Sequence, residues 1–145
     1  MNEQEWLLIE EVFPVHKIGR PREYSNREIM NAIRYQQHTG CQWDMLPNEF
    51  PPHGVVQHHF YEWRNNGLFE KMQKKLHAML RKKQGRKEEP GLAIIDSQSV
   101  KTGQKGGERG YDAGKKIKGR KRHIAIDVTG HIIACDVHSA GVQNL

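Results

Sequence analysis

The hydrophobic periodicity of the sequence changes once, near residue 90, and this change divides the chain into two parts. Before it, apolar residues recur every three or four positions, as in helices that bury one face. The clearest case is the set Leu68, Met72, Leu76 and Met79. After it, a continuous apolar run, Leu92–Ile95, leads into alternating apolar residues, as in β-strands. We therefore predict an α+β chain with a helical domain at 1–84, a linker at 85–91 closed by Pro90-Gly91, and a strand domain at 92–145.

Four helices are expected in the first part. Residues 3–12 have apolar side chains at helical spacing. Ser25 and Glu28 have the spacing of a capping box, and the helix that they open should end near Gly40. A third helix is expected over Val55–Asn66, and a fourth carries the Leu68 series. The fourth helix ends in a basic run, Arg81-Lys82-Lys83.

The expected third helix has one apolar and one polar face. Val56, Phe60 and Trp63 should be buried, and the outward side chains are Gln57, His58, His59, Arg64 and Asn65. Such a helix after a connector suits helix-turn-helix-like reading of a major groove, with Gln57, His58 and Arg64 as candidate base contacts. A helical bundle with an ordinary polar surface is the alternative. His58 and His59 point to different helix sides, so we expect surface histidines and no shared metal ion.

Three strands are expected in the second part, at Leu92–Ile95, His123–Val128 and His131–Val137, with a long loop over Ser97–Gly119. The first run is typical of a strand buried on both faces. Asp96 follows it directly and should lie at the rim of the sheet. A carboxylate held there suits a magnesium ligand for phosphodiester chemistry, or an ordinary turn cap.

Positive charge is concentrated in the middle of the chain. Residues 101–122 carry 9 Lys and Arg against 2 Asp and Glu, whereas residues 1–70 carry 6 against 10. A localised positive patch is expected for a phosphate-rich partner, although a solvated basic surface is the plain alternative. The candidate backbone contacts are Arg20, Arg22, Lys101, Lys115, Lys116, Arg120, Lys121 and Arg122.

Several features bear on where the chain acts. The first residues are acidic, which is unlike a signal peptide. No apolar run approaches the length of about 18 residues that a membrane span needs, so no membrane partner is expected. Only two cysteines occur, Cys41 and Cys135, which predicts a reducing, cytoplasmic environment and no disulfide framework.

Several motifs resemble a known family in unbroken order along nearly the whole chain. Gly19-Arg20-Pro21-Arg22, Thr39-Gly40-Cys41-Gln42-Trp43 and Phe50-Pro51 resemble the N-terminal domain of insertion-sequence transposases of the IS-five type. Ile95-Asp96-Ser97-Gln98-Ser99-Val100-Lys101 and Gly110-Tyr111-Asp112-Ala113-Gly114-Lys115-Lys116 resemble the start of its catalytic domain.

The resemblance implies an RNase H-like fold, of which this chain would hold the first three strands, and DDE chemistry. In that chemistry two Asp and one Glu hold two Mg²⁺ ions for in-line attack on a phosphodiester. Asp96 matches the first Asp, as a catalytic residue and metal ligand. The resemblance also implies binding to transposon terminal inverted repeats at the bacterial nucleoid.

The other acids of a DDE site are expected beyond Leu145. Asp127 should lie near the far end of the second expected strand, roughly 15 Å from Asp96 at about 3.3 Å per residue. Asp136 should lie one strand further out, so we expect structural roles for both. The family's pattern carries an acidic residue near Asn144, and this sequence does not. We therefore expect a truncated copy or the first frame of a split element. Such a chain should be inactive alone, and it should bind Mg²⁺ only as part of a completed site. The partner would be a downstream transposase segment or a second copy. The alternatives are a non-catalytic DNA-binding regulator and a degenerate remnant.

Overall fold

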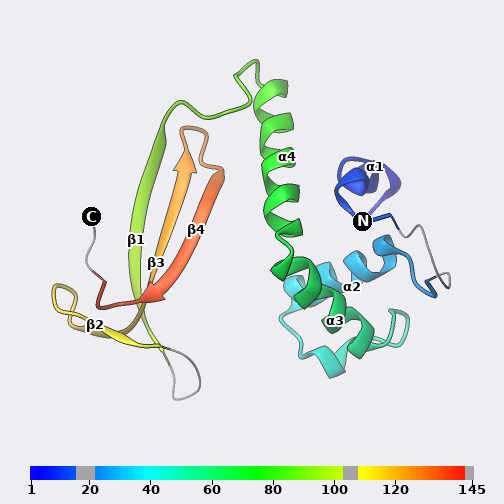
Figure 1. The fold of residues 1–145 in the computed structure, drawn as a ribbon, viewed down its shortest axis with the longest axis horizontal. Helices are drawn as coiled ribbons and strands as arrows, with labels where there is room; N and C mark the ends of the chain where they lie inside the picture. Colours follow the sequence, from blue (N-terminus) through cyan, green and yellow to red (C-terminus); the bar gives the residue numbers. More distant parts are fainter. Residues whose placement is uncertain (16–21, 103–107, 143–145) are drawn as a thin grey trace. The chain divides into compact units, whose positions relative to one another are not determined.

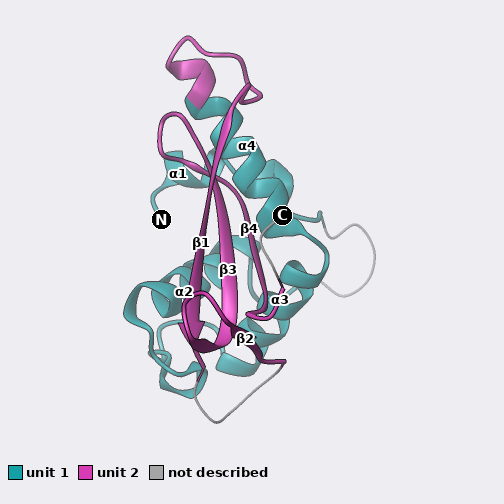
Figure 2. Cartoon of the chain, turned by 90° about the vertical axis from the view of Figure 1, so that its left-hand side faces the viewer, with its two compact units in different colours: residues 1–80 teal, residues 81–145 magenta. Residues whose placement is uncertain are grey.

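The computed structural model describes residues 1–15, 22–102 and 108–142. The chain forms two compact units, residues 1–80 and residues 81–145, which we call unit 1 and unit 2 (Figure 2). Unit 1 is helical and unit 2 contains an antiparallel sheet, so the α+β class is confirmed. The boundary between the units falls inside the fourth helix and not in the expected linker. The assignment of one unit to DNA binding and the other to catalysis stays a prediction.

Two short helices stand where one helix was expected at residues 3–12. They are α1, Glu3–Leu7, and the 3-10 helix η1, Glu10–Val12. A capping box opens α1, in which the Asn2 side chain accepts from the Glu5 backbone N at 2.7 Å. The break between the helices allows Trp6, Ile9 and Phe13 all to be buried in one core.

The second helix begins and ends where the sequence predicted. It is α2, Asn26–Thr39, and the capping box is formed because Ser25 N donates to the Glu28 carboxylate at 2.8 Å while Ser25 Oγ accepts from Glu28 N. Gly40 ends it at φ 67°, in the left-handed region that favours glycine. A second 3-10 helix, η2, Trp43–Met45, follows.

The last two helices of unit 1 are α3, His53–Asn65, and α4, Leu68–Lys83, separated at Gly67. Aromatic rings connect the core, because the Phe13 ring lies 5.0 Å from the rings of both Trp6 and Trp63. The buried core residues are Trp6, Ile9, Phe13, Ile29, Ala32, Ile33, Val56, Trp63 and Leu68. Unit 1 is thus held by a continuous apolar core.

Unit 2 is a four-stranded antiparallel sheet around a long central strand (Figure 1). This strand is β3, Ile117–Asp127, which pairs with β1, Ala93–Lys101, and with β4, Ile132–Ser139. The short strand β2, Gly110–Asp112, pairs with the first residues of β3. The three long strands therefore place the stretches around residues 96, 123 and 136 next to each other.

The expectation of three strands and a long loop at Ser97–Gly119 was wrong. β1 continues to Lys101, β2 occupies part of the expected loop, and β3 begins at Ile117. The apolar pattern misses these parts because their cross-strand pairs are polar, for example Ser99 with Lys121. Backbone pairing, not side-chain hydrophobicity, extends the sheet there.

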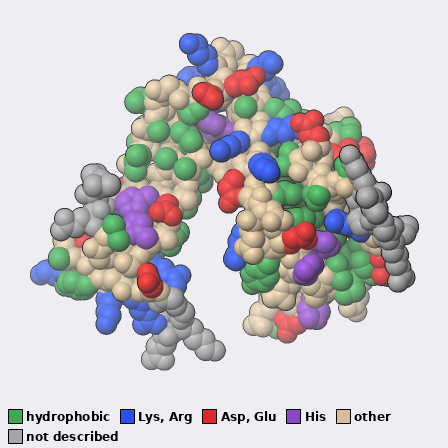
Figure 3. Space-filling view, viewed as in Figure 1, with side chains coloured by type: hydrophobic (Ala, Val, Ile, Leu, Met, Phe, Trp, Pro, Cys, Tyr) green, Lys and Arg blue, Asp and Glu red, His purple; other side chains and the backbone are tan. Residues whose placement is uncertain are grey.

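The expectation that Leu92–Ile95 is buried on both faces was also wrong, because the exposed fraction is 51% for Ile94 and 71% for Ile95. The described part of unit 2 consists of strands and turns apart from the end of α4, so no helical layer of its own covers the sheet. Figure 3 shows hydrophobic side chains over the strands and Lys and Arg side chains near β2. The sheet thus has an apolar end and a basic end.

Two glycines explain part of the sequence motif in unit 2. A Cβ atom on Gly119 would lie 2.0 Å from the backbone O of Val100, and one on Gly110 would lie 2.1 Å from the backbone N of Gly141. Both positions therefore require the absence of a side chain, because backbone atoms of neighbouring strands or turns occupy the space.

Candidate functional site

Asp96 lies in the middle of β1 and not at the end of a strand, which corrects the expectation from the sequence. The polar residues that follow it continue the pairing with β3, so the strand ends only at Lys101. The Asp96 side chain is exposed, and its Oδ1 atom accepts a hydrogen bond from the Ser97 backbone N at 2.8 Å. The carboxylate therefore projects from a sheet face and is open to a ligand.

The pairing register places Asp96 on the same face of the sheet as two arginines. Two and four residues beyond Asp96, β1 pairs with Arg122 and Arg120 of β3. Residues paired across antiparallel strands project to the same face, and faces alternate along each strand. We call this side the Asp96 face. Arg122 donates to the side-chain oxygen of Gln98, which holds its guanidinium over this face.

Lys121 points to the opposite face and is buried, with an exposed fraction of 5%. Its Nζ atom donates to the backbone O of Val142 at 2.9 Å and lies 3.6 Å from a carboxylate oxygen of Asp112. The ammonium group is therefore engaged inside unit 2. A role for Lys121 in DNA binding stays a prediction, and the structure adds an internal role that the sequence did not indicate.

The remaining basic candidates of unit 2 are exposed. Lys101 is the last residue of β1, whereas Lys115 and Lys116 lie in the turn between β2 and β3. The Lys115 Nζ atom donates to the backbone O of Ser97 at 2.9 Å. Lys116 adopts a φ of 52°, which is uncommon for a residue other than glycine. These lysines lie at the basic end of the sheet.

The candidates in unit 1 lie at several places. Arg20 lies outside the described residues. Arg22 is exposed, and its Nη1 atom donates to the Asn26 side chain at 2.8 Å, at the start of α2. His58 is exposed on α3, and Gln57 is half-buried. All four remain predicted DNA contacts.

The polar face of α3 is narrower than expected. Arg64 is exposed and lies over the Tyr61 ring, with 4.9 Å from its Cζ atom to the ring centroid. His59 is not exposed as expected, because its ring lies 5.5 Å from the Trp63 ring and its Nδ1 atom is 3.1 Å from the Glu62 carboxylate. Of the side chains expected to face outward, His58, Arg64 and Asn65 are exposed.

Two further acids of the sheet, Asp127 and Asp136, lie apart from Asp96. Asp127 pairs with Ala93, three residues along β1 from Asp96, which corresponds to about 10 Å rather than 15 Å. Its buried carboxylate forms an ion pair of 2.8 Å with Arg81. Asp136 pairs with His123, and the alternation of the strands places it on the face opposite Asp96. Neither acid shares a site with Asp96.

The residues present do not form a complete metal site. Among residues 1–15, 22–102 and 108–142, no group of three His, Cys, Asp or Glu side chains is arranged to hold a metal ion. A magnesium ion needs several oxygen ligands, and Asp96 offers one carboxylate. Asp96 can contribute to a metal site, but the described chain does not build one around it.

Sequence reasoning missed the buried ion pair of Arg81 with Asp127. Arg81 also donates through Nε to the backbone O of Lys87 at 2.8 Å, so it fastens the segment before β1 to the end of β3. Arg81 stands in a basic run and looked like a surface residue. No local sequence pattern indicates this ion pair, because its two partners are 46 positions apart.

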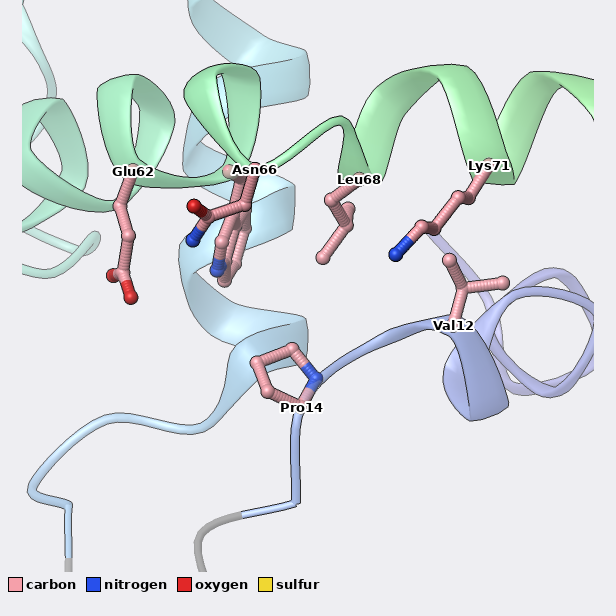
Figure 4. A pocket seen from close by; sticks show the side chains of 7 residues that line it. Val12, Pro14, Glu62, Asn66, Leu68 and Lys71 are labelled. Carbon is pink, nitrogen blue, oxygen red and sulfur yellow. The ribbon is translucent and has the colours of Figure 1, made fainter.

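Unit 1 contains a shallow pocket between the end of α3, the start of α4 and the segment after η1 (Figure 4). Its volume is about 210 Å³, and its labelled side chains include Glu62, Asn66 and Lys71. This volume is below the roughly 300–1,000 Å³ of typical small-molecule sites. The pocket is therefore a poor candidate for the main site.

Comparison with known proteins identifies the class of the chain and then its family. Residues 1–73 match the family model described as "Putative transposase of IS4/5 family", and residues 87–144 match the model "Transposase DDE domain". These matches support a transposase of the DDE type. The chain belongs to the IS4/5 transposase family. No curated protein and no solved structure matches it. In the part of the chain that the structure describes, no helix has the length and apolarity to cross a membrane.

Proposed function

We propose that this chain binds the terminal inverted repeats of an insertion element, and that Asp96 is the first acid of the family's DDE site. The observation that carries the proposal is the sharing of one sheet face by Asp96, Arg120 and Arg122. Guanidinium groups beside the acid suit the phosphodiester backbone of DNA, because they form charge-assisted hydrogen bonds with phosphate oxygens.

The fold assignments implied by the family belong to this proposal. The antiparallel trio β1, β3 and β4 supports an RNase H-like sheet. The packing of α2 against α3 and the exposed His58 and Arg64 support a helix-turn-helix-like reader in unit 1. DNA recognition would then combine base contacts from unit 1 with phosphate contacts from unit 2.

The DDE family implies a divalent metal ion, which we expect to be Mg²⁺, and it would supply Lewis-acid activation of the phosphodiester when bound. Asp96 would supply one carboxylate ligand. Since the described residues do not complete the site, we assign to this chain the binding and orientation of DNA beside Asp96. A further transposase segment, acting at the nucleoid, would provide the remaining acids. A homo-oligomer would add only a second Asp96.

Fluorescence anisotropy of the full chain with labelled duplexes tests the proposal. One duplex carries the inverted repeat flanking the gene, and the other is a scrambled duplex of equal length. If several cationic side chains contact phosphates, affinity should fall by about tenfold or more between 50 mM and 200 mM salt. Arg120→Gln and Arg122→Gln should weaken binding to both duplexes alike. Absent or salt-insensitive binding would overturn the proposal.

The same assay separates base reading from backbone contact. His58→Ala and Arg64→Ala should each reduce the preference for the repeat by about 1–3 kcal/mol. Equal weakening on both duplexes would show that α3 contacts only the backbone. A regulator of transposition would give a different result. It would bind the repeat specifically but would not support strand cleavage in Mg²⁺ or Mn²⁺, even with added transposase segments.

A further inference from the structure

Three polar groups surround the carboxylate of Asp112 at the basic end of the sheet, and together the four groups form a cluster. Ser99 Oγ donates to Asp112 Oδ2 at 2.5 Å, and Lys115 N donates to Asp112 Oδ1 at 3.0 Å. The Lys121 ammonium lies 3.6 Å from Oδ2. One carboxylate thus connects β1, β3 and the turn that follows β2.

The Asp112 contacts define the conformation of that turn. Asp112 pairs with Ile117, so residues 113–116 form the connection between β2 and β3. An aspartate that accepts from a backbone N–H a few residues later closes a turn, as Asx-type turns do. Lys116 stands at φ 52°, a conformation that costs free energy for a residue with a side chain and so needs support from its surroundings. Asp112 supplies this support.

The interior position of the cluster makes it stiff. The side chains of Asp112 and Lys121 retain exposed fractions of only 11% and 6%. Hydrogen bonds from Ser99, then from the Lys115 N–H, together with the Lys121 charge, lower the pKa of Asp112 to about 2. Asp112 is therefore ionised near neutral pH, and the cluster does not act as a pH switch there.

We propose that Asp112 is a positioning residue that presents Lys115 and Lys116 at the tip of the β2–β3 hairpin to DNA phosphates. This inference rests on the proposed DNA-binding function. Ser99 and Lys121 fix Asp112, Asp112 fixes the turn, and the turn carries two exposed lysines. The lysine pair then binds phosphates with less loss of conformational freedom, because the backbone that carries it is already ordered.

Removal of the Asp112 charge gives an effect of unusual sign. Removing a carboxylate close to lysines that bind DNA should by itself strengthen binding, since the carboxylate repels phosphates. If Asp112 positions the lysine tip, Asp112→Asn should instead weaken binding by about 3- to 10-fold at 0.1 M salt. Asp136→Asn is the matched control, because Asp136 is an exposed acid of the same sheet outside this cluster.

Anisotropy of the full chain with a scrambled duplex, at two salt concentrations, provides the test. Lys115→Gln with Lys116→Gln should weaken binding, and adding Asp112→Asn to that pair should cause no further loss. Ser99→Ala should also weaken DNA binding, but less strongly than Asp112→Asn. If Asp112→Asn does not fold, Ser99→Ala provides the test. Amide exchange of Lys115 should be faster in both variants.

The outcomes separate the two proposals. No binding by the unaltered chain would overturn the proposed function and this inference together. Normal binding by the unaltered chain, with unchanged or tighter binding by Asp112→Asn and by Ser99→Ala, would overturn the inference alone. An additive loss in the triple variant would do the same, because Asp112 would then act independently of the lysines.

Discussion

Units 1 and 2 bury different kinds of side chain. In the described residues, nine of the ten buried hydrophobic side chains belong to unit 1, and Ala140 is the exception. The buried polar and charged residues, Arg81, Ser99, Lys121 and Asp127, all belong to unit 2. Unit 1 is therefore stabilised mainly by apolar burial, whereas ion pairs and hydrogen bonds organise unit 2. Two of these groups, Ser99 and Lys121, also contact Asp112 before the turn that carries Lys115 and Lys116.

The largest expected effect is loss of the apolar core of unit 1. Trp63 is fully buried and its ring contacts Phe13, so Trp63→Ala should destabilise unit 1 by about 3–5 kcal/mol. Trp63→Phe should cost less, since it keeps an aromatic ring and removes an indole N–H that has no hydrogen-bond partner among the described residues. Amide exchange should show the loss in unit 1 only, and equal loss in unit 2 would contradict separate cores.

The next effect concerns the ion pair that organises unit 2. Asp127→Ala would leave the Arg81 guanidinium buried without its charge partner, so protection of unit 2 amides should fall by about 3 kcal/mol or more. The double variant Arg81→Met with Asp127→Leu should recover part of the loss. Lys82→Met is the control, because the exposed pair of Lys82 with Glu88 at 3.8 Å should contribute less than about 1 kcal/mol.

The three long helices of unit 1, α2, α3 and α4, were predictable because their signals are local. The Ser25–Glu28 capping box and Gly40 are encoded within a few residues of the helix ends that they specify. In unit 2 the apolar ends of the strands were visible, but β2 and the second half of β1 were not. Their side chains are polar, and only pairing with β3 shows that they are strands.

The sequence predicts candidate site residues, which stay predictions, but it does not predict their geometry. Asp96 followed from the motif and the preceding apolar run. The separation of Arg122 from Lys121, one beside Asp96 and the other buried on the opposite face, depends on the start and register of β3. The role of Asp112 likewise depends on a contact with Ser99 across 13 positions of sequence.

Acid should affect the two units through different carboxylates. Hydrogen bonds from Ser25 lower the pKa of Glu28 in unit 1, and the Ser99 bond above all lowers the pKa of Asp112 in unit 2. A depressed folded-state pKa contributes stability that is present above the unfolded pKa and lost as pH falls through the folded value. For Asp112 this stability is lost as the pH falls from 3.8 to about 2.

Amide exchange at about pH 5 and pH 2.5 should therefore show weaker protection of the β2–β3 hairpin in acid. Asp112→Asn should remove this part of the pH dependence, and Glu28→Gln should remove only the part that belongs to α2. A hairpin whose protection is the same at both pH values in the unaltered chain would show that the Asp112 carboxylate does not stabilise it.

The central claim is that DNA lies along the Asp96 face of unit 2. The smallest expected effect tests this claim most directly. Phosphates beside Asp96 would be repelled by its carboxylate within a Debye length, which is about 10 Å at 0.1 M salt and longer at lower salt. In anisotropy titrations of the full chain at about 50 mM salt, Asp96→Asn should therefore tighten binding to duplex DNA by about 2- to 5-fold. Asp136→Asn, on the opposite face, should change it much less. Equal tightening in both variants, or tightening in Asp136→Asn alone, would contradict the claim.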